Sequence, residues 1–330
     1  METLVDIKDL VKHFPAGQSW FGRTKEYVHA VNGVSLEIKK GETLGLVGES
    51  GCGKSTLGLM ILRLIDPDKG RIIFDGKDIT TTSQRELRPL RRGMQMVFQD
   101  PFASLNPRMT VGEIIDEPLL VHRFGSKSDR ISQVADLLRL VGLSGDAASR
   151  YPHEFSGGQR QRIGIARAIA LKPKLIIADE PVSALDVSIR GEIINLLADL
   201  QEKFGLTYLF ISHDLTVVEH VSSRIAVMYL GKLMEVFPAS KIVNASHPYT
   251  QALISAIPIP DPKAKKKRIV LAGDVPSPLS LPSGCPFHPR CRYAQNVCRE
   301  KEPAFESYKE GCFAACHFIR EMTPLENEFR

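Results

Sequence analysis

Short apolar runs recur along the chain and are bounded by turn-forming residues. A run of four to six apolar residues predicts a buried strand, and alternation of apolar and polar residues predicts a strand with one solvated face. The run from Val34 to Ile38 alternates in this way. Strands are therefore expected at 4–7, 34–38, 43–47, 71–76, 95–98, 175–178, 207–211 and 223–228.

Apolar residues at helical spacing separate many of these strands. Residues Ile131, Val134, Leu138 and Val141 follow this spacing, and a second stripe comprises Ile189, Ile193, Leu196, Leu197 and Leu200. Helices are expected at 57–65, 111–150, 160–171 and 188–204. Strands that alternate with helices predict an α/β fold with a mainly parallel sheet covered on both faces.

The character of the chain changes near residue 258. Pro258, Pro260 and Pro262 precede a basic run at 263–268, which we interpret as a solvated linker rather than a lipid contact because no apolar face accompanies it. We expect a main domain at 1–258, with a helical subdomain at about 100–165, and a C-terminal extension at 259–330.

Composition adds limits on the cellular setting. The 330 residues are 43% hydrophobic and 25% charged, as in ordinary globular proteins, and the net charge of +5 does not demand nucleic acid. No apolar run approaches the roughly 18 residues of a membrane span, and the first ten residues do not resemble a signal peptide. The sequence therefore predicts a cytosolic protein, unless a partner holds it at a membrane.

A phosphate-binding loop (P-loop) follows the strand at 43–47 and opens the next helix. It fits the pattern G-x-x-x-x-G-K-[ST] in its required context, with Gly48, Ser50, Gly51, Cys52, Gly53, Lys54, Ser55 and Thr56 as the expected nucleotide contacts. The glycines allow backbone N–H groups to surround phosphate oxygens. Lys54 supplies a positive charge for the β- and γ-phosphates, and the Ser55 hydroxyl is placed to ligate Mg²⁺.

A second loop of this kind comprises Phe155, Ser156, Gly157, Gly158 and Gln159, and it also precedes a helix. Free N–H groups at a helix N-terminus make a second site for an anion. One chain can hardly place both loops on the same phosphate when each begins its own helix. We therefore expect two molecules to face each other head to tail, so that each loop completes the site of the other.

Polar residues with catalytic potential end two apolar strands. Asp179 and Glu180 follow 175–178, and His213 follows 207–211. The carboxyl ends of parallel strands are where α/β sheets bind ligands, so these side chains are expected at one edge of the sheet.

These motifs together resemble the ATPase subunit of an ABC transporter. The resemblance rests on GESGCGKST, FSGGQRQR, LIIADEP and ISHDL in this order, and it covers roughly residues 4–258. It implies that Asp179, Ser55 and Gln99 hold Mg²⁺ and that Glu180 polarises the attacking water. It also implies that His213 contacts the γ-phosphate.

The resemblance assigns further nucleotide contacts. Ser156, Gly157, Gly158 and Gln159 would cap the γ-phosphate of the opposing subunit, and Asp186 would belong to the loop through which the two sites communicate. The family more often carries Leu at position 155, but its phosphate-binding SGGQ core is intact here. An aromatic ring is expected to stack on the adenine. Phe14 is our assignment and Tyr27 its rival, because the polar insert at 15–27 blurs the correspondence.

Five of the six cysteines fall within the last fifty residues. Such a cluster beside histidines, in a cytosolic chain, suggests a metal site rather than disulfides. The spacing of Cys285, Cys291, Cys298, Cys312 and Cys316 matches neither common zinc sites nor ferredoxins, so the residues alone leave the metal open.

A second resemblance concerns this extension. The stretches HPYTQAL, GDVPSP and CPFHPRC resemble the C-terminal extension of dipeptide and oligopeptide permease ATPases. In that group an iron–sulfur cluster is associated with four cysteines, which correspond here to Cys285, Cys291, Cys298 and Cys316. Cys312 would be a spare thiol or an alternative ligand. The alternatives are zinc and reduced cysteines without metal.

The expected function is therefore ATP hydrolysis that energises peptide import. The partners implied are transmembrane permease subunits, a second similar ATPase and, indirectly, an extracytoplasmic peptide-binding protein, with the chain peripheral on the cytoplasmic side of the membrane. Two alternatives are an importer of nickel or another solute and a soluble ABC ATPase that acts on nucleic acid. The second is disfavoured because the chain has one ATPase unit and its basic residues lack interleaved aromatics.

Overall fold

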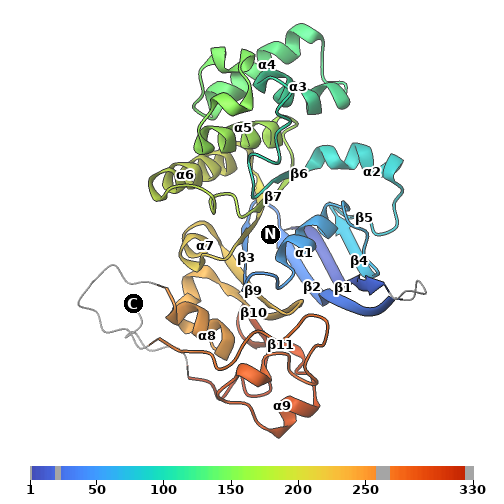
Figure 1. Cartoon of the computed structure of the whole chain (residues 1–330), viewed down its shortest axis with the longest axis vertical. Helices are drawn as coiled ribbons and strands as arrows, with labels where there is room; N and C mark the ends of the chain where they lie inside the picture. Colours follow the sequence, from blue (N-terminus) through green and yellow to red (C-terminus); the bar gives the residue numbers. More distant parts are fainter. Residues whose placement is uncertain (1, 19–23, 258–267, 324–330) are drawn as a thin grey trace. The chain divides into compact units, whose positions relative to one another are not determined.

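The computed structural model describes residues 2–18, 24–257 and 268–323, and its elements are labelled in Figure 1. The basic run at 263–268 lies, apart from Arg268, outside the described residues. Within the described part of the chain, no helix has both the length and the apolarity needed to cross a membrane.

The chain divides into two compact units. The helical unit consists mainly of Thr81–Ile211. The P-loop unit comprises Thr3–Ile38, Thr43–Thr80 and the chain from Ser212 onward, so it includes the described part of the C-terminal extension.

One sheet of the P-loop unit is antiparallel. Its strands lie in the order β2 (Thr24–Lys39), β1 (Thr3–Gln18), β4 (Lys69–Phe74), β5 (Lys77–Asp78), shown in blue to cyan in Figure 1. The expected strands at 4–7 and 34–38 are therefore confirmed but too short, and the strand and turn expected at 71–76 are confirmed with the strand at Lys69–Phe74. In particular, residues 15–18 and 24–27 of the presumed insert continue β1 and β2. This segment is polar, so it contains no apolar run that would predict these parts of β1 and β2.

The second sheet of this unit carries the P-loop. Strand β3 (Thr43–Val47) pairs in parallel with β9 (Arg224–Tyr229), as the apolar runs predicted. Three antiparallel strands that the runs did not predict continue the sheet from β9. They are β10 (Lys232–Pro238), β12 (Cys312–Ala315) and β11 (Phe305–Lys309).

Short helices complete the P-loop unit. They are α1 (Lys54–Ile61), α7 (Leu215–Val221), α8 (Pro248–Ser255) and α9 (Asn296–Glu300), with 3₁₀ segments at Ala239–Asn244, which is kinked at Lys241, and at His288–Arg290.

The helical unit contains three parallel strands, β6 (Met94–Val97), β7 (Leu175–Asp179) and β8 (Thr207–Ser212). Every residue of β7 and β8 is buried, which explains their continuous apolar sequences. The helices of the unit are α2 (Gln84–Leu90), α3 (Val111–Val121), α4 (Lys127–Leu140), α5 (Gly157–Ile169) and α6 (Val187–Phe204), with 3₁₀ turns at Arg91–Gly93, Gly145–Ser149 and Pro152–Glu154.

The helical region predicted at 111–150 is two helices and a 3₁₀ turn. Helix α4 begins at a capping box in which Ser126 accepts a hydrogen bond from the backbone N–H of Asp129. Val134 and Leu138 are buried, but Ile131 is 63% exposed although it shares their spacing. It lies in the second turn after the cap, and the buried stripe of α4 begins only at Val134.

A buried carboxylate ties the extension to the core of the P-loop unit. Glu235 in β10 is fully buried and accepts hydrogen bonds from the backbone N–H groups of Ser246 (2.9 Å) and His247 (3.2 Å). It also accepts one from the hydroxyl of Tyr308 in β11 (2.6 Å). Burial raises the pKa of Glu235 despite these donors. Burial of this carboxyl group is therefore tolerated only because these donors form hydrogen bonds with it, and the extension supplies one of them, Tyr308.

We expect the substitution Tyr308→Phe to lower the free energy of unfolding of the P-loop unit by about 1–3 kcal/mol, because the buried Glu235 Oε1 loses one of its three hydrogen-bond donors. Denaturant unfolding followed by circular dichroism measures the change. Tyr293→Phe is the matched control, since Tyr293 lies in the same extension but is 40% exposed. Equal stability of the two variants would show that the hydroxyl does not anchor the extension.

Candidate ATP site and cysteine pocket

The P-loop follows a path that only glycine can take at two positions. Gly48 has φ 156° and Gly53 has φ 104°. A Cβ atom at Gly48 would lie 2.1 Å from the carbonyl oxygen of Met228, and one at Gly53 would lie 1.9 Å from that of Ala30. Backbone packing therefore excludes any side chain at these two positions.

Lys54 is the first residue of α1, and its side chain is buried by the loop itself. Its Nζ atom donates hydrogen bonds to the carbonyl oxygens of Gly48 (2.8 Å) and Glu49 (3.0 Å). The neighbouring Cys52 is buried, and burial raises the pKa of its thiol. The thiol is therefore kept neutral, in keeping with a backbone role for this position. Ser50, Gly51, Ser55 and Thr56 complete the loop and the first turn of α1.

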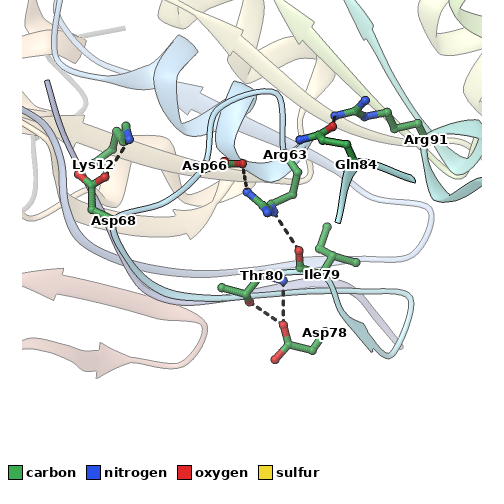
Figure 2. A network of polar contacts seen from close by, with 9 residues as sticks. All are labelled: Lys12, Arg63, Asp66, Asp68, Asp78, Ile79, Thr80, Gln84 and Arg91. Atoms are coloured by element: carbon green, nitrogen blue, oxygen red, sulfur yellow. Dashed lines mark hydrogen bonds and ion pairs between the residues drawn. The ribbon is translucent and has the colours of Figure 1, made fainter. Parts of the chain in front are cut away.

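An ion pair fixes the segment that carries Phe14. Asp68 pairs with Lys12 Nζ (2.8 Å) and accepts a hydrogen bond from the backbone N–H of His13 (2.7 Å), as Figure 2 shows for the lysine. The ammonium of Lys12 lies 5.5 Å from the centroid of the Phe14 ring. Phe14 is partly exposed and Tyr27 is 47% exposed, so both rings are accessible in the P-loop unit.

The helical unit brings two predicted catalytic residues into contact. Asp179 ends β7 and is buried, and Glu180 follows it with φ 45°, in the left-handed region that costs a non-glycine residue of order 1–3 kcal/mol. The side-chain amide of Gln99 donates a hydrogen bond to Glu180 Oε2 (2.9 Å). The backbone N–H of Glu180 donates to the carbonyl of Ile211 (2.9 Å), which holds this turn against β8. Sequence reasoning expected both residues at the site but did not predict this contact.

The second predicted anion loop caps α5. Ser156 Oγ accepts a hydrogen bond from the N–H of Gln159 (3.3 Å), and Gln159 Oε1 accepts one from the N–H of Ser156 (3.0 Å). Both residues are exposed, whereas the preceding Phe155 is buried. A Cβ atom at Gly158 would lie 2.6 Å from the Ile189 side chain, so a glycine there allows α5 and α6 to approach closely.

Two further predicted residues lie at the starts of helices. Asp186 is the exposed N-cap residue of α6 and makes no side-chain capping bond. Gly157, the first residue of α5, is partly exposed. His213 directly follows β8 and is exposed, next to Asp214, which caps α7. Each is therefore found at the strand end or helix start that the sequence indicated.

Four cysteines of the extension line one small cavity. These are Cys285, Cys291, Cys298 and Cys316, and the cavity is also lined by His247, His288, His317 and Phe287. Cys312 is not part of this lining and lies in β12. Burial, and then the neighbouring cysteines, raise the pKa of Cys285 to about 12; burial chiefly raises that of Cys316 to about 11. In the described part of the chain, no group of three or more His, Cys, Asp or Glu side chains is placed to hold a single metal ion.

Sequence reasoning missed two residues that contact the P-loop. The hydroxyl of Tyr249 in α8 accepts a hydrogen bond from the N–H of Glu49 (3.0 Å), and Arg290 pairs with the Glu49 carboxylate. The stretches HPYTQAL and CPFHPRC contain these residues, but no spacing within them points to a loop some 200 positions earlier in the chain.

Comparison with known proteins places these features in a family. A family model described as ABC transporter matches residues 31–183. The chain is 54% identical to the oligopeptide transport ATP-binding protein AppF of Bacillus subtilis, over 96% of this chain and 97% of that protein. It is 53% identical to the probable peptide ABC transporter ATP-binding protein y4tS of Sinorhizobium fredii, over 96% of this chain and 90% of that one. The chain belongs to the ABC transporter family.

Solved structures of ABC cassettes agree with this assignment. The ATP-binding cassette MJ0796, solved as a dimer in a post-hydrolysis state bound to ADP and Pi, matches with a TM-score of 0.64 and 32% identity. The match covers 71% of this chain and 98% of that cassette. CbiO1 from Clostridium perfringens, part of an ABC transporter complex, matches with a TM-score of 0.63 and 27% identity over 73% of this chain and 91% of its own. The expected α/β fold of an ABC-type P-loop NTPase is thus confirmed, and the chain is an ATPase of this type.

The extension of this ABC ATPase has a match of its own. A family model described as the oligopeptide/dipeptide transporter C-terminal region matches residues 234–298. The matched segment begins in β10 and includes Cys285, Cys291 and Cys298, whereas Cys316 lies beyond it.

Proposed function

We propose that this ABC ATPase energises the import of dipeptides or oligopeptides through a membrane permease. The observation that carries the proposal is the C-terminal region at 234–298, because its family is described by oligopeptide and dipeptide transport. Relatives at 50–54% identity carry names of peptide or oligopeptide transport and import proteins, and they align over nearly the whole chain. The peptide itself would be selected by other subunits.

In the proposed ATP site, the P-loop backbone and Lys54 bind the phosphates. Ser55, Gln99 and Asp179 supply oxygen ligands of the kind that Mg²⁺ prefers. Phe14 is our assignment for the ring that stacks on adenine, and its accessible position beside Lys12 supports that role.

Glu180 is the proposed group that polarises the attacking water, and His213 orients the water and the γ-phosphate. The hydrogen bond from Gln99 fixes Oε2 of Glu180 and so orients the carboxylate for this role. Hydrolysis would be a direct phosphoryl transfer to water, in which positioning and charge stabilisation lower the barrier.

Two chains would be needed for a complete site. Ser156 and Gln159 are exposed at the start of α5, where they can contact the γ-phosphate bound by an opposing subunit. Asp186, at the exposed start of α6, would contact the partner in the same dimer. A dimeric cassette bound to ADP and Pi is among the solved relatives, which supports this arrangement.

We further propose that the assembly includes permease subunits, with this chain peripheral on the cytoplasmic side of the inner membrane. A peptide-binding protein outside the membrane would deliver the substrate. Nucleic acid would have no part in this function.

The cysteine pocket is the proposed site of a 4Fe–4S cluster. Such clusters are held by four cysteine thiolates, and four cysteines line the cavity while Cys312 stays apart. The donor set therefore fits the group. The cluster, when bound, would cross-link the extension, since Cys298 lies in α9, Cys316 follows β12, and Cys285 and Cys291 flank the 3₁₀ segment His288–Arg290.

We expect Glu180→Gln to lower the steady-state ATPase rate of the assembled transporter by at least about 10²-fold, because the water loses its carboxylate. Equilibrium binding of a fluorescent ATP analogue should be unchanged, since affinity depends on the P-loop and Mg²⁺. Glu202→Gln, at an exposed position of α6, is the matched control and should retain full activity. A rate for Glu180→Gln within about threefold of the wild-type rate would contradict the assigned role.

The opposed-loop arrangement predicts complementation between two inactive variants. Lys54→Ala lacks a working P-loop, and Ser156→Arg lacks a working second loop. A mixed dimer contains one site that has both intact parts, so mixing the variants should restore ATPase activity that neither shows alone. The rate per wild-type subunit should also rise with protein concentration or with the natural partner ATPase. A high rate independent of dilution, in a protein shown to be monomeric, would disprove the arrangement.

The cluster assignment predicts that anaerobically purified protein contains iron and absorbs broadly near about 400 nm. Cys298→Ser should lose both signals and loosen the extension, whereas the control Cys312→Ser should keep the iron. Elemental analysis distinguishes the alternatives. About one zinc per chain with no iron would refute the cluster in favour of zinc, and absence of any metal would leave the cysteines as packing residues.

A further inference from the structure

The C-terminal extension contacts the P-loop through a single arginine. Arg290 ends the 3₁₀ turn His288–Arg290, and its Nη1 atom donates hydrogen bonds to both carboxylate oxygens of Glu49, at 3.1 and 2.8 Å. The Arg290 side chain is only 9% exposed and that of Glu49 is 26% exposed. The pair is therefore shielded from solvent. Water and salt screen its electrostatic attraction less than they would screen that of a fully exposed pair.

Glu49 is held from three sides. Its backbone N–H donates to Tyr249 Oη (3.0 Å), its backbone carbonyl accepts from Lys54 Nζ (3.0 Å), and its carboxylate accepts from Arg290. One residue of the loop thus links the lysine that binds phosphate, helix α8 and the extension. The position of Glu49 in the P-loop pattern is one where any residue is permitted, so the carboxylate is a feature of this chain rather than of the pattern.

A carboxylate in this loop opposes the binding of an anion. The P-loop receives the phosphates of ATP, and a negative charge on the same loop repels them. Arg290 offsets that charge. An arginine side chain stays protonated in proteins, and Nη1 of Arg290 lies within hydrogen-bond distance of both Glu49 carboxylate oxygens and 3.5 Å from Tyr229 Oη.

Packing fixes the arginine in place. The ring of Phe287, three residues earlier, is buried and lies 5.5 Å from the ring of Tyr229 and 5.3 Å from that of Tyr249. The N–H of Arg290 donates to the carbonyl of Phe287 (3.0 Å). The guanidinium therefore projects from a rigid turn and loses little rotamer entropy when it pairs with Glu49.

We propose that Arg290 is a positioning residue for ATP binding, which acts through Glu49 to neutralise and orient the P-loop. The extension is then part of the nucleotide site, although it does not contact the nucleotide in this scheme. The Glu49 carboxylate pairs with Arg290, whereas Lys54 donates only to the backbone carbonyl of Glu49. The positive charge of Lys54 is therefore available for the phosphates.

Binding of a fluorescent ATP analogue with Mg²⁺ to the full chain tests this role. Arg290→Gln should raise the dissociation constant about tenfold, because the carboxylate is left uncompensated beside the phosphates. In the assembled transporter the KM for ATP should rise while kcat changes by less than about twofold. Arg290→Lys keeps the charge and should recover part of the affinity. Arg292→Gln, an exposed arginine two residues away, is the matched control and should bind as the wild type does.

The decisive variant is the double substitution Glu49→Gln with Arg290→Gln. It removes the repulsive charge together with its partner, so its dissociation constant should return to within about threefold of the wild-type value. A double variant that binds as weakly as Arg290→Gln would overturn the proposal and leave Arg290 as a packing residue. A dissociation constant of Arg290→Gln within about twofold of wild type would also overturn it. Should Arg290→Gln unfold, as checked by thermal denaturation of each variant, Arg290→Lys and the double variant still decide the question.

Discussion

The nucleotide-binding end of this protein depends on the absence of two Cβ atoms. At Gly48 and Gly53 the P-loop passes against the carbonyls of Met228 and Ala30, at distances that no side chain would permit. Met228 belongs to β9 of the P-loop sheet and Ala30 to β2 of the antiparallel sheet, so one loop is packed against both sheets of its unit. The path of the loop, and with it the position of Lys54, is therefore set by contacts of main chain with main chain.

The same unit includes the C-terminal extension. Strand β12 pairs with β10, and Tyr308 of the adjacent strand donates to the buried Glu235. A metal-binding appendage joined by a linker would have left the core sheet unchanged. Here the extension supplies the outer strands of that sheet and, through Arg290, a charge for the P-loop. The P-loop and the cysteine pocket thus belong to one compact unit.

The sequence predicted those parts of the fold in which the polarity of each residue matches its burial. Strands β7 and β8 are wholly buried and read as continuous apolar runs. Strand β10 was missed because Glu235 interrupts its apolar sequence, and the donor that makes this charge acceptable lies 73 residues further along the chain. Ile131 shows the converse error, since its spacing is that of a buried stripe although its side chain meets solvent.

The candidate site divides in the same way. The sequence predicted that Glu180 and His213 follow buried strands and that Ser156 precedes a helix. The structure has them after β7, after β8 and before α5, and these features could be predicted because the motifs are local. The contact of Gln99 with Glu180, and that of Arg290 with Glu49, join residues far apart in sequence. Their side chains carry no local mark of the partner, so only the folded chain shows them.

The chain order of the two units has a consequence for synthesis on the ribosome. The helical unit is nearly contiguous in sequence, since it consists mainly of residues 81–211. It can therefore form soon after residue 211 has emerged from the ribosome. In the P-loop unit, β3 pairs with β9 (Leu44 with Arg224) and β10 pairs with β12 (Glu235 with Ala314), and such distant pairings form slowly. The P-loop is made early but stays without its outer strands and without Arg290 until the last segments appear. For most of its synthesis the nascent chain therefore carries a P-loop that lacks its Arg290 partner and a strand β10 whose outer edge is unpaired.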